Sequence, residues 1–324
     1  MSDVDVSLVV PSFRGSFRLP VLFRALRAQD FEGSWEAVIV VDGIVDDSPE
    51  LVENCDDLPV RLVSFEENRG RSAALNAGFD AARGRVLVRC DDDLEPHSTY
   101  LRDHVAAHAG PDPVGAIGIC QNLYPETPYA KSYGIHWDEK FRLDAYAAPA
   151  SGRWRYWAGN CSVTRETFDR VGPYDENFRS YGWEDADWGY RLDQIGVGIE
   201  ILPELEVRHH AANTSTGIRV SRAFMSGGAH CRFDLKHGIE PHRPTQPGLR
   251  PKLWNAGVDV LASGGTMNRF RRYTGIVDRM IRIAPRNVDV KLVAALVEAA
   301  AIAGYRTEAE GRTPDLDAVS PDDR

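Results

Sequence analysis

The chain has 324 residues, of which 27% are charged and 43% are hydrophobic, a balance typical of a folded protein with one large or two smaller domains. The formal net charge of -10 argues against non-specific binding to nucleic acid or to an anionic membrane surface. A diphosphate substrate would therefore need a metal ion or local arginines rather than a favourable overall field.

The five cysteines are scattered and odd in number, and their spacing matches neither a disulfide framework nor a zinc site. This usage predicts a reducing, cytoplasmic environment. The N-terminal segment is acidic and polar until a strand near Val6, so we expect no signal peptide. The longest apolar run, residues 292–303, is too short to span a bilayer.

The first part of the chain alternates apolar runs with segments of helical periodicity. The predicted strands are residues 6–11, 35–41, 60–65 and 86–88. The predicted helices are residues 18–29, a segment capped by Ser48 with Pro49 in its first turn, and residues 71–82. This order predicts an α/β fold with a mainly parallel sheet flanked by crossover helices.

Ligands of such sheets bind at the carboxyl ends of the strands. That edge would carry residues 11–14, Asp42 with Gly43, residues 66–69 and residues 91–93. The chain lacks a G-x-G-x-x-G motif after the first strand and lacks a G-x-x-x-x-G-K-[ST] motif. A dinucleotide-binding fold and a P-loop are therefore not expected.

Three adjacent acids, Asp91, Asp92 and Asp93, follow the fourth predicted strand and precede Pro96. Adjacent carboxylates repel one another, so their position needs a physical reason. A solvated loop that caps the next helix is one reason. A divalent cation is another, because hard cations bind carboxylate oxygens.

From about residue 116 the alternation weakens. Residues 124–149 predict a long loop with a hairpin, and residues 233–251 predict a connector rich in proline and histidine. Residues 269–303 return to a helical pattern, and residues 307–324 predict a disordered acidic tail.

A second acidic stretch follows Gly182, which predicts a turn before a helix. Glu184, Asp185 and Asp187 would lie in the first helical turn, where the helix dipole favours anions. The alternative is a positioned carboxylate base beside aromatic rings. Neighbouring residues on a helix point about 100° apart, so Glu184 and Asp185 are not expected to share one role.

Two adjacent histidines, His209 and His210, follow the apolar run at 199–202. Together with Asp91 and Asp93, one of them could complete a mixed oxygen and nitrogen site. An added imidazole favours Mn²⁺ or a similar transition ion over a pure oxygen site for Mg²⁺ or Ca²⁺.

These pieces, taken in order, resemble the nucleotide-sugar glycosyltransferases of family 2, which have the GT-A fold. The resemblance covers roughly residues 6–215 and is carried by Val9-Val10-Pro11-Ser12, Val40-Val41-Asp42-Gly43, Asn68-x-Gly70 with Asn76-x-Gly78, Asp91-x-Asp93, Gly182-Trp183-Glu184-Asp185, and His209.

The resemblance implies a Rossmann-like GT-A domain over residues 1–230, which binds the nucleotide sugar and carries catalysis. A mainly helical extension would follow at 231–306, with the tail at 307–324. The implied reaction moves one sugar from a nucleoside-diphosphate sugar, expected to be a UDP-sugar, to an acceptor hydroxyl with inversion. Mn²⁺ or Mg²⁺ would be the cofactor, and the acceptor would be a small molecule, a glycan or a peptide.

The implied partners exclude nucleic acid, and no integral membrane segment is expected; the extension could form a homo-oligomer. Two other classes of protein fit the same residues. One is a sugar-phosphate nucleotidylyltransferase, which releases pyrophosphate instead of a nucleoside diphosphate. The other is a non-catalytic sugar-binding protein on the same fold.

The resemblance also implies roles for individual residues. Asp185 would be the catalytic base, and Glu184 would bind the acceptor or the donor sugar. Asp91, Asp93 and His209 would bind the metal, with His210 as the alternative histidine. The residues expected to bind the nucleotide sugar are Pro11, Ser12, Arg14, Asp42, Asn68, Arg71, Asp91, Asp92, Gly159, Asn160 and Trp183.

The sequence departs from the family pattern at two positions. Ile44 follows Asp42-Gly43, where the family commonly has two acids followed by Gly-Ser, and Leu75 precedes Asn76, where an arginine is frequent. The Q-x-x-R-W motif of processive synthases is absent, which favours transfer of a single sugar.

Overall fold

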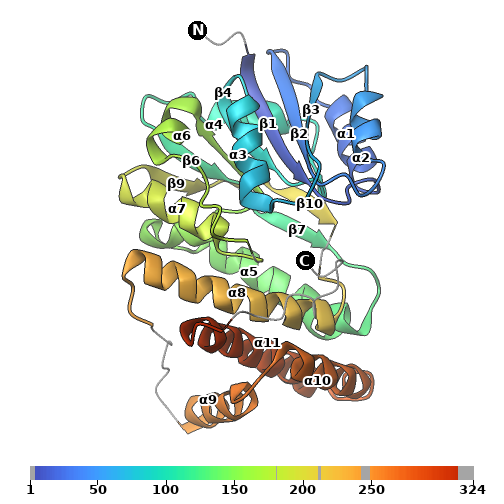
Figure 1. The fold of residues 1–324 in the computed structure, drawn as a ribbon, viewed down its shortest axis with the longest axis vertical. Coiled ribbons are helices and arrows are strands. Elements are labelled where there is room, and N and C mark those ends of the chain that lie inside the picture. The colour runs from blue at the N-terminus through green and yellow to red at the C-terminus, as the bar shows by residue number, and fades with distance from the viewer. Residues whose placement is uncertain (1–3, 180, 211–212, 242–248, 313–324) are drawn as a thin grey trace. The chain divides into compact units, whose positions relative to one another are not determined.

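The computed structural model of the chain describes residues 4–179, 181–210, 213–241 and 249–312 (Figure 1). The chain forms two compact units that interleave along the sequence. The first unit comprises Met1–Leu123, Lys140–Arg179 and Glu184–Ala211, and the second comprises Tyr124–Glu139, Ser180–Trp183 and Ala212–Arg324. The division of roles between residues 1–230 and 231–306 stays a prediction.

A seven-stranded sheet of order β3-β2-β1-β4-β8-β6-β9 forms the centre of the first unit. Its strands are β1 (Val4–Ser12), β2 (Trp35–Asp42), β3 (Val60–Phe65), β4 (Gly84–Cys90), β6 (Val114–Ile117), β8 (Asn160–Thr164) and β9 (Gly198–Ile201). Strands β1 to β4 are parallel, β8 is antiparallel to β4 and β6, and β6 is parallel to β9. The predicted α/β class with a mainly parallel sheet is confirmed.

One face of this sheet is covered by the helices α1 (Leu19–Arg27), α2 (Ser48–Glu53) and α4 (Tyr100–Ala107). Their apolar side chains share a core with the inward side chains of β1, such as Leu8 and Val10. Burial on both faces explains why β1 and β2 are almost continuous apolar runs rather than alternating ones.

The opposite face of the sheet is covered by α3 (Arg71–Ala81) and α6 (Arg165–Val171) (Figure 1). Gly78 permits the close approach of α3, because a Cβ atom at this position would overlap the side chain of Val9. The rings of Phe79 and Phe168 pack 4.5 Å apart and join the two helices.

A second, three-stranded sheet has the order β5-β10-β7, with β5 (Leu94–Glu95), β10 (Val207–His210) and β7 (Cys120–Leu123). In its register, His209 pairs with Leu94 on one side and with Asn122 on the other. This sheet therefore brings the end of the acidic stretch beside the predicted metal-binding histidine. The remaining elements of the first unit are α7 (Glu184–Gln194), η2 (Ala150–Tyr156) and η3 (Pro203–Leu205).

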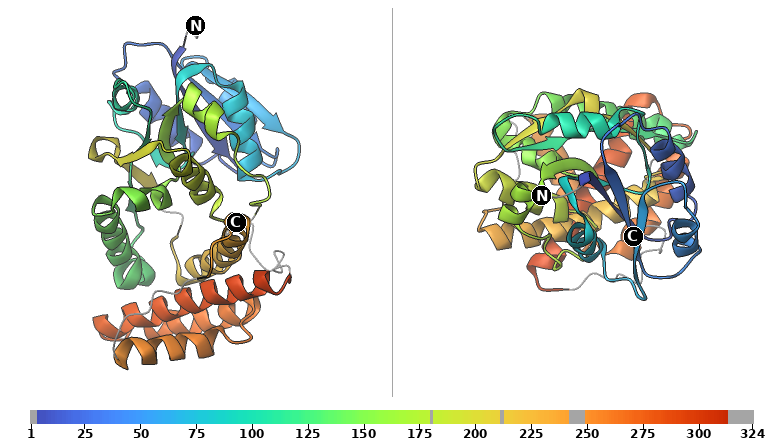
Figure 2. Two further views of the ribbon diagram at one scale, coloured as in Figure 1. Left: turned by 90° about the vertical axis from the view of Figure 1, so that its left-hand side faces the viewer. Right: turned by 90° about the horizontal axis from the view of Figure 1, so that it is seen from above.

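The second unit is helical, as Figure 2 shows at its orange and red end. Its elements are η1 (Ala130–Gly134), α8 (Thr216–His237), α9 (Leu249–Ala262), α10 (Met267–Met280) and α11 (Arg286–Ala309), and α5 (Ile135–Tyr146) begins in this unit and ends in the first. The predicted helical C-terminal region is confirmed.

Helices α8 and α11 approach each other closely where each has a glycine. A Cβ atom on Gly227 would overlap the carbonyl group of Ala301, and one on Gly304 would overlap the carbonyl group of Phe224. The contact is therefore backbone against backbone, and no side chain could move aside to make room. Glycine inside a helix costs up to about 1 kcal/mol relative to alanine, and here the packing requires it.

The predicted loop at residues 124–149 is wrong, because this segment forms η1 and α5. Tyr129 and Tyr133 lie four residues apart and are buried in the core of the second unit. The other buried residues of this core lie in α8, α9, α10, α11 and the turn after α10, so the residues that bury these two tyrosines are distant in sequence.

Three predicted boundaries also differ from the structure. Ser48 lies inside α2, whose N-cap position is Asp47, and the Ser48 amide donates to the carboxylate of Asp46 at 3.1 Å. Helix α8 continues to His237, into the predicted connector, of which residues 242–248 lie outside the described residues. Helix α11 continues to Ala309, and residues 313–324 of the predicted tail lie outside the described residues.

None of the helices in the described part of the chain is both long and apolar enough to cross a bilayer.

We expect Gly227→Ala to destabilise the second unit by about 1–3 kcal/mol, because the added methyl group has no space against α11. The matched control is Gly275→Ala in α10, where an added Cβ atom meets nothing within 4 Å. This control should be neutral or stabilise by about 0.5–1 kcal/mol. Thermal unfolding of both variants checks the prediction, and equal effects would contradict the packing argument.

Candidate active site

The ends of β1, β2 and β4 lie side by side at the carboxyl edge of the sheet, as expected. Asp42, at the end of β2, accepts hydrogen bonds from the backbone amides of Arg69 and Gly70, at 2.6 and 2.9 Å. The side-chain amide of Asn68 donates to the Asp42 carbonyl oxygen at 3.2 Å. Burial raises the pKa of Asp42, and the two amide hydrogen bonds offset only part of this effect. Asp42 thus holds the loop that precedes α3.

Ser12 and Asp92, both predicted to bind the nucleotide sugar, contact each other. The Ser12 hydroxyl donates to Asp92 at 2.6 Å, and Arg18 donates to the same carboxylate at 2.8 and 2.9 Å. Burial raises the pKa of Asp92, although the contact with Arg18 lowers it in part.

Pro11 lies in β1 beside Val40, and Arg14 is exposed with a positive φ of 55°. The predicted donor-binding roles of these residues stay predictions.

Arg89 is the central cation of the site, and its side chain is only 1% exposed. Its Nε atom donates to Asp91 Oδ1 at 3.1 Å, and its guanidinium also forms an ion pair with Asp185. Burial alone would lower the pKa of Arg89, but Asp91 and other neighbouring groups together outweigh this effect, so the pKa of Arg89 is raised. Burial likewise raises the pKa of Asp91, but Arg89 and Arg71 outweigh it, so the pKa of Asp91 is lowered.

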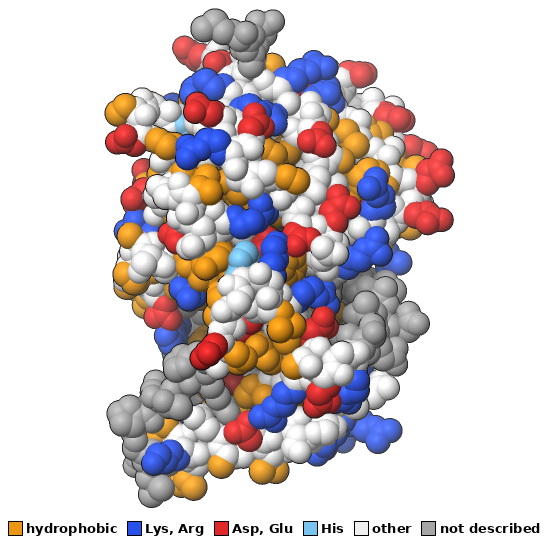
Figure 3. Space-filling view, turned by 60° about the vertical axis from the view of Figure 1, so that its left-hand side comes forward, with side chains coloured by type: hydrophobic (Ala, Val, Ile, Leu, Met, Phe, Trp, Pro, Cys, Tyr) orange, Lys and Arg blue, Asp and Glu red, His pale blue; other side chains and the backbone are white. Residues whose placement is uncertain are grey.

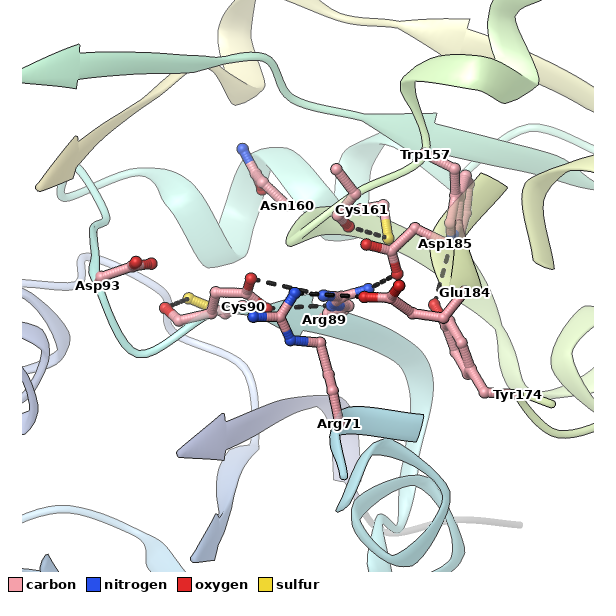
Figure 4. A network of polar contacts seen from close by, with 12 residues as sticks. Arg71, Arg89, Cys90, Asp93, Trp157, Asn160, Cys161, Tyr174, Glu184 and Asp185 are labelled. Carbon is pink, nitrogen blue, oxygen red and sulfur yellow. Dashed lines mark hydrogen bonds and ion pairs between the residues drawn. The ribbon is translucent and has the colours of Figure 1, made fainter. Parts of the chain in front are cut away.

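Glu184 and Asp185 begin α7, as predicted, and each has a different cationic partner. Glu184 accepts from Arg71 at 3.2 Å, whereas Asp185 pairs with Arg89. Figure 4 shows the two arginines pointing toward these carboxylates, with Asp93 apart from the group. The structure therefore supports separate roles for the two neighbouring acids. The second carboxylate oxygen of Glu184 is buried and accepts no hydrogen bond in the described structure.

Trp183 directly precedes Glu184 in sequence but belongs to the second unit. Its backbone has a positive φ of 70°, and the preceding Gly182 has a φ of 93°, which confirms the predicted turn. The indole ring stacks on the imidazole of His230, with centroids 3.9 Å apart and planes at 5°. The predicted role of Trp183 in binding the nucleotide sugar stays a prediction.

Asp93 and His209 form the pair that could hold a metal ion. Asp93 Oδ2 lies 2.9 Å from His209 Nε2, and His209 Nδ1 lies 2.6 Å from the side-chain oxygen of Asn122. A proton on Nδ1 satisfies Asn122 and leaves Nε2 with a lone pair that faces a carboxylate. Such a contact requires a proton or a cation between the two acceptors.

The donor set fits a divalent cation. Two cis ligands on an ion with ligand distances of about 2.1 Å lie about 3 Å apart, close to the observed 2.9 Å. Asp93 Oδ1 is buried and has no hydrogen-bond partner in the described structure. However, no group of three or more His, Cys, Asp or Glu side chains within the described residues could hold a metal. Asp91, the third predicted ligand, instead faces Arg89.

His210 differs from His209 in its contacts. Its Nε2 atom lies 3.1 Å from Glu95 Oε2, and its side chain is 45% exposed. Its backbone amide donates to the Asp93 carbonyl oxygen at 2.9 Å. Of the two histidines, only His209 directs its ring toward Asp93.

Gly159 and Asn160 occupy different surroundings. The Gly159 carbonyl accepts from the Asp91 amide at 2.9 Å, and a Cβ atom at Gly159 would overlap the Asp91 carboxylate. Asn160 is fully buried, and its amide donates to the Leu205 carbonyl at 2.7 Å. Its side-chain oxygen accepts from Tyr100 at 2.9 Å. These contacts favour a structural role for Asn160, and its place in the sugar pocket stays a prediction.

Sequence reasoning assigned no role to three residues of this site: Arg18, Arg89 and Asn122. A signal for Arg89 was present, since it is a cation that follows the apolar run 86–88 and comes shortly before the acids. A buried charge of this kind needs a partner. Arg18 and Asn122 carry no such signal, because each contacts a partner that is distant in sequence, by 74 and 87 positions.

Comparison with solved structures identifies the fold class of the chain. The solved mannosyltransferase from Pyrobaculum calidifontis in complex with GDP-Man and Mn²⁺ has a TM-score of 0.63, with 18% identity, and the match covers 95% of this chain and 88% of that one. The structure of GalNAc-T7 with UDP, GalNAc and Mn²⁺ has a TM-score of 0.54, with 15% identity, and covers 83% and 53% of the two chains. The fold is therefore that of the GT-A glycosyltransferases.

The family follows from the sequence profiles. Residues 7–172, half of the chain, match the profile of Glycosyl transferase family 2, so the chain belongs to this family. Residues 143–213 also match a profile described as the N-terminal domain of galactosyltransferase.

A curated relative is the validoxylamine A glucosyltransferase of Streptomyces hygroscopicus subsp. jinggangensis, 27% identical over 245 residues. The match covers 65% of this chain and 58% of that protein. In the same enzyme from subspecies limoneus it covers 54%, so the chain spans little more than half the length of these relatives.

Two buried histidines of α4 and the residue after it contact polar side chains of β8. His104 and His108 both contact the hydroxyl of Ser162, at 2.9 and 2.8 Å, and His104 also lies 3.2 Å from the side-chain oxygen of Asn160. Burial lowers the pKa of His104 to about 3 and that of His108 to about 4. Both imidazoles are therefore neutral in the folded protein near neutral pH.

We expect the protein to lose stability as the pH falls below about 6.5, because the unfolded chain then binds protons at His104 and His108 that the folded chain excludes. The stabilising effect of neutral His104 is fully present above about pH 6.5 and lost as the pH approaches about 3. At about pH 4.5 the loss is on the order of 3 kcal/mol for this residue. His104→Gln should flatten the dependence of the unfolding temperature on pH, whereas the same substitution at exposed His136 should not. Parallel pH profiles for all three proteins would contradict this assignment.

Proposed function

We propose that this chain transfers one sugar from a nucleoside-diphosphate sugar to an acceptor hydroxyl, with a divalent metal ion and with inversion at the anomeric carbon. The observation that carries the proposal is the contact between Asp93 and His209, in which a carboxylate oxygen and a ring nitrogen lie 2.9 Å apart and need a proton or a cation between them. A second acid, Asp185, lies on the other side of the same acidic stretch and is held by Arg89.

The proposed donor is a UDP-sugar. The two solved structures named above hold GDP-Man with Mn²⁺ and UDP with GalNAc and Mn²⁺, which supports a nucleotide donor with a divalent ion. Asp42 would accept from the nucleobase, and Pro11, Ser12, Arg14 and Asn68 would flank the nucleotide. Arg71, which is 42% exposed and pairs with Glu184, would reach the base or the diphosphate.

Asp93 and His209 would hold the metal ion, which when bound supplies positive charge for the leaving diphosphate. Asn122 fixes the ring of His209 through Nδ1, and such an outer contact sets which ring nitrogen is available as a ligand. The net charge of -10 makes local cations necessary for a diphosphate, and Arg71 is the cation expected there.

Asp185 would act as the base that removes the proton of the acceptor hydroxyl. A base must be held within hydrogen-bond reach of that proton. Arg89 would hold Asp185 in place, because the same guanidinium also pairs with Asp91. Attack on the face opposite the leaving diphosphate would invert the anomeric carbon. Glu184 would bind a sugar hydroxyl through its carboxylate oxygen that has no hydrogen-bond partner in the described structure.

We expect Asp185→Asn to reduce turnover by about 10²–10⁴-fold, the usual contribution of a general base, with donor affinity preserved. The control is Asp193→Asn, the same substitution in the last turn of α7. Turnover is followed as release of nucleoside diphosphate, and donor binding by calorimetry. A wild-type rate in Asp185→Asn would remove this residue from the base role, and release of pyrophosphate would instead indicate a nucleotidylyltransferase.

We expect His209→Ala to abolish the metal-dependent part of nucleoside-diphosphate binding, and His210→Ala to preserve it, because only His209 directs its ring toward Asp93. In the wild-type protein, UDP at about a hundred times its dissociation constant should stabilise the fold by about 2.7 kcal/mol with Mn²⁺, and much less with EDTA. Thermal shift measures the effect for a panel of nucleoside diphosphates. If none of them shifts the wild-type protein, the non-catalytic class gains support.

A further inference from the structure

The outer surface of α10 and of the turn after it combines apolar and cationic side chains. Ile276 is 53% exposed, Met280 is 42% exposed and Ile283 is 88% exposed. Three arginines are exposed beside them: Arg272, Arg279 and Arg282. We call these six residues the α10 face.

The other side of α10 packs in the hydrophobic core of the second unit. Phe270, Thr274 and Val277 are buried at the spacing of a single helical face. Positions three, four and seven residues apart share a face, so Arg272, Ile276 and Arg279 follow one another along the opposite, outer side. The apolar residues of the α10 face are thus not part of the hydrophobic core.

Helix α9 adds further exposed apolar area. Leu253 is 65% exposed and Val260, one heptad later, is 72% exposed. Figures 1 and 2 show α9 and α10 at the same end of the helical unit. At the lower end of the face drawn in Figure 3, hydrophobic side chains and Lys or Arg side chains lie near one another.

The charge of this segment is opposite to that of the whole chain. Residues 249–291 contain nine Lys or Arg residues and three Asp or Glu residues, which gives +6, whereas the chain as a whole has -10. Attraction to a charged surface acts over about 8–10 Å at physiological ionic strength, so the local charge decides which surface this segment can approach.

We propose that the α10 face binds the surface of a bilayer that contains anionic phospholipids. The arginines would contact lipid phosphates, and Ile276, Met280 and Ile283 would enter the boundary between headgroups and acyl chains. A second copy of the chain fits this face less well, because two surfaces of the same positive charge repel each other in a symmetric dimer. Nucleic acid would pair with the arginines but would leave the isoleucines without an apolar partner.

This proposal is independent of the proposed reaction, because none of its residues belongs to the candidate active site. It also differs from a membrane-spanning segment, which the helices of the described chain do not provide. The expected association is peripheral and reversible, and it should weaken as salt screens the arginines.

The test is flotation of the full chain with two kinds of vesicle: phosphatidylcholine alone, and an equimolar mixture of phosphatidylcholine and phosphatidylglycerol. The wild-type chain should float only with the mixed vesicles, and less so at high salt. A variant with Arg272→Gln, Arg279→Gln and Arg282→Gln should partition about a hundredfold more weakly, since each surface arginine contributes about fivefold.

A control with the same change in net charge carries Arg24→Gln, Arg170→Gln and Arg179→Gln, all exposed positions of the first unit. It should bind the mixed vesicles within about twofold of the wild type, because its arginines lie outside the proposed face. Equal loss in both triple variants would show an effect of overall charge and overturn the proposal. So would failure of the wild-type chain to float with either vesicle.

The apolar contribution is tested by Ile276→Ser combined with Ile283→Ser, both exposed positions whose replacement leaves the core intact. This variant should keep the unfolding temperature of the wild type and lose most of its binding to the mixed vesicles. Light scattering measures the oligomeric state and so tests the alternative of a protein interface. A wild-type dimer that becomes a monomer in this variant would identify the face as a protein interface and overturn the proposal.

Discussion

Three consecutive carboxylates at the end of β4 impose the main constraint on this fold, since each needs a partner of its own. Asp91 pairs with Arg89 from its own strand, Asp92 with Arg18 from the start of α1, and Asp93 with His209 from β10. The three partners come from different directions and different elements. Each partner offsets the repulsion that its carboxylate meets from the neighbouring acids. The three contacts also join the parallel sheet, its covering helix and the small second sheet.

The first of these contacts has the strictest requirements, because Arg89 is almost completely buried. Removing one partner of a buried ion pair costs about 3–5 kcal/mol, as the remaining charge is left uncompensated. Arg89 has two anionic partners, Asp91 and Asp185, so the strand end and the start of α7 are held by one guanidinium. The position of the proposed base is therefore a consequence of how β4 buries a charge.

The third contact is of a different kind. Asp92 and Arg18 form an ion pair, and so do Glu184 and Arg71. With the Nδ1 proton of His209 donated to Asn122, Asp93 and His209 instead present two hydrogen-bond acceptors to each other. A pair of this kind is complete only when a proton or a metal ion joins it. Among the acids of the stretch, Asp93 is thus the one whose contacts leave capacity for an external cation, and this supports its proposed separation in role from Asp91 and Asp92.

The sequence by itself determined the parallel sheet, the edge at which the acids gather and the separate directions of Glu184 and Asp185. These properties depend on local periodicity and on strand polarity, which are expressed over a few neighbouring residues. The partners of the acids were decided only by the tertiary structure: Arg18 reaches Asp92 across 74 positions, and Asn122 reaches His209 across 87. The same holds for residues 124–149, where Tyr129 and Tyr133 are buried in a core whose other buried residues lie far along the chain, from Val220 to Ala303. Periodicity reports which side of an element is apolar, but only the packed structure brings together the distant side chains that neutralise a buried charge or cover an aromatic ring.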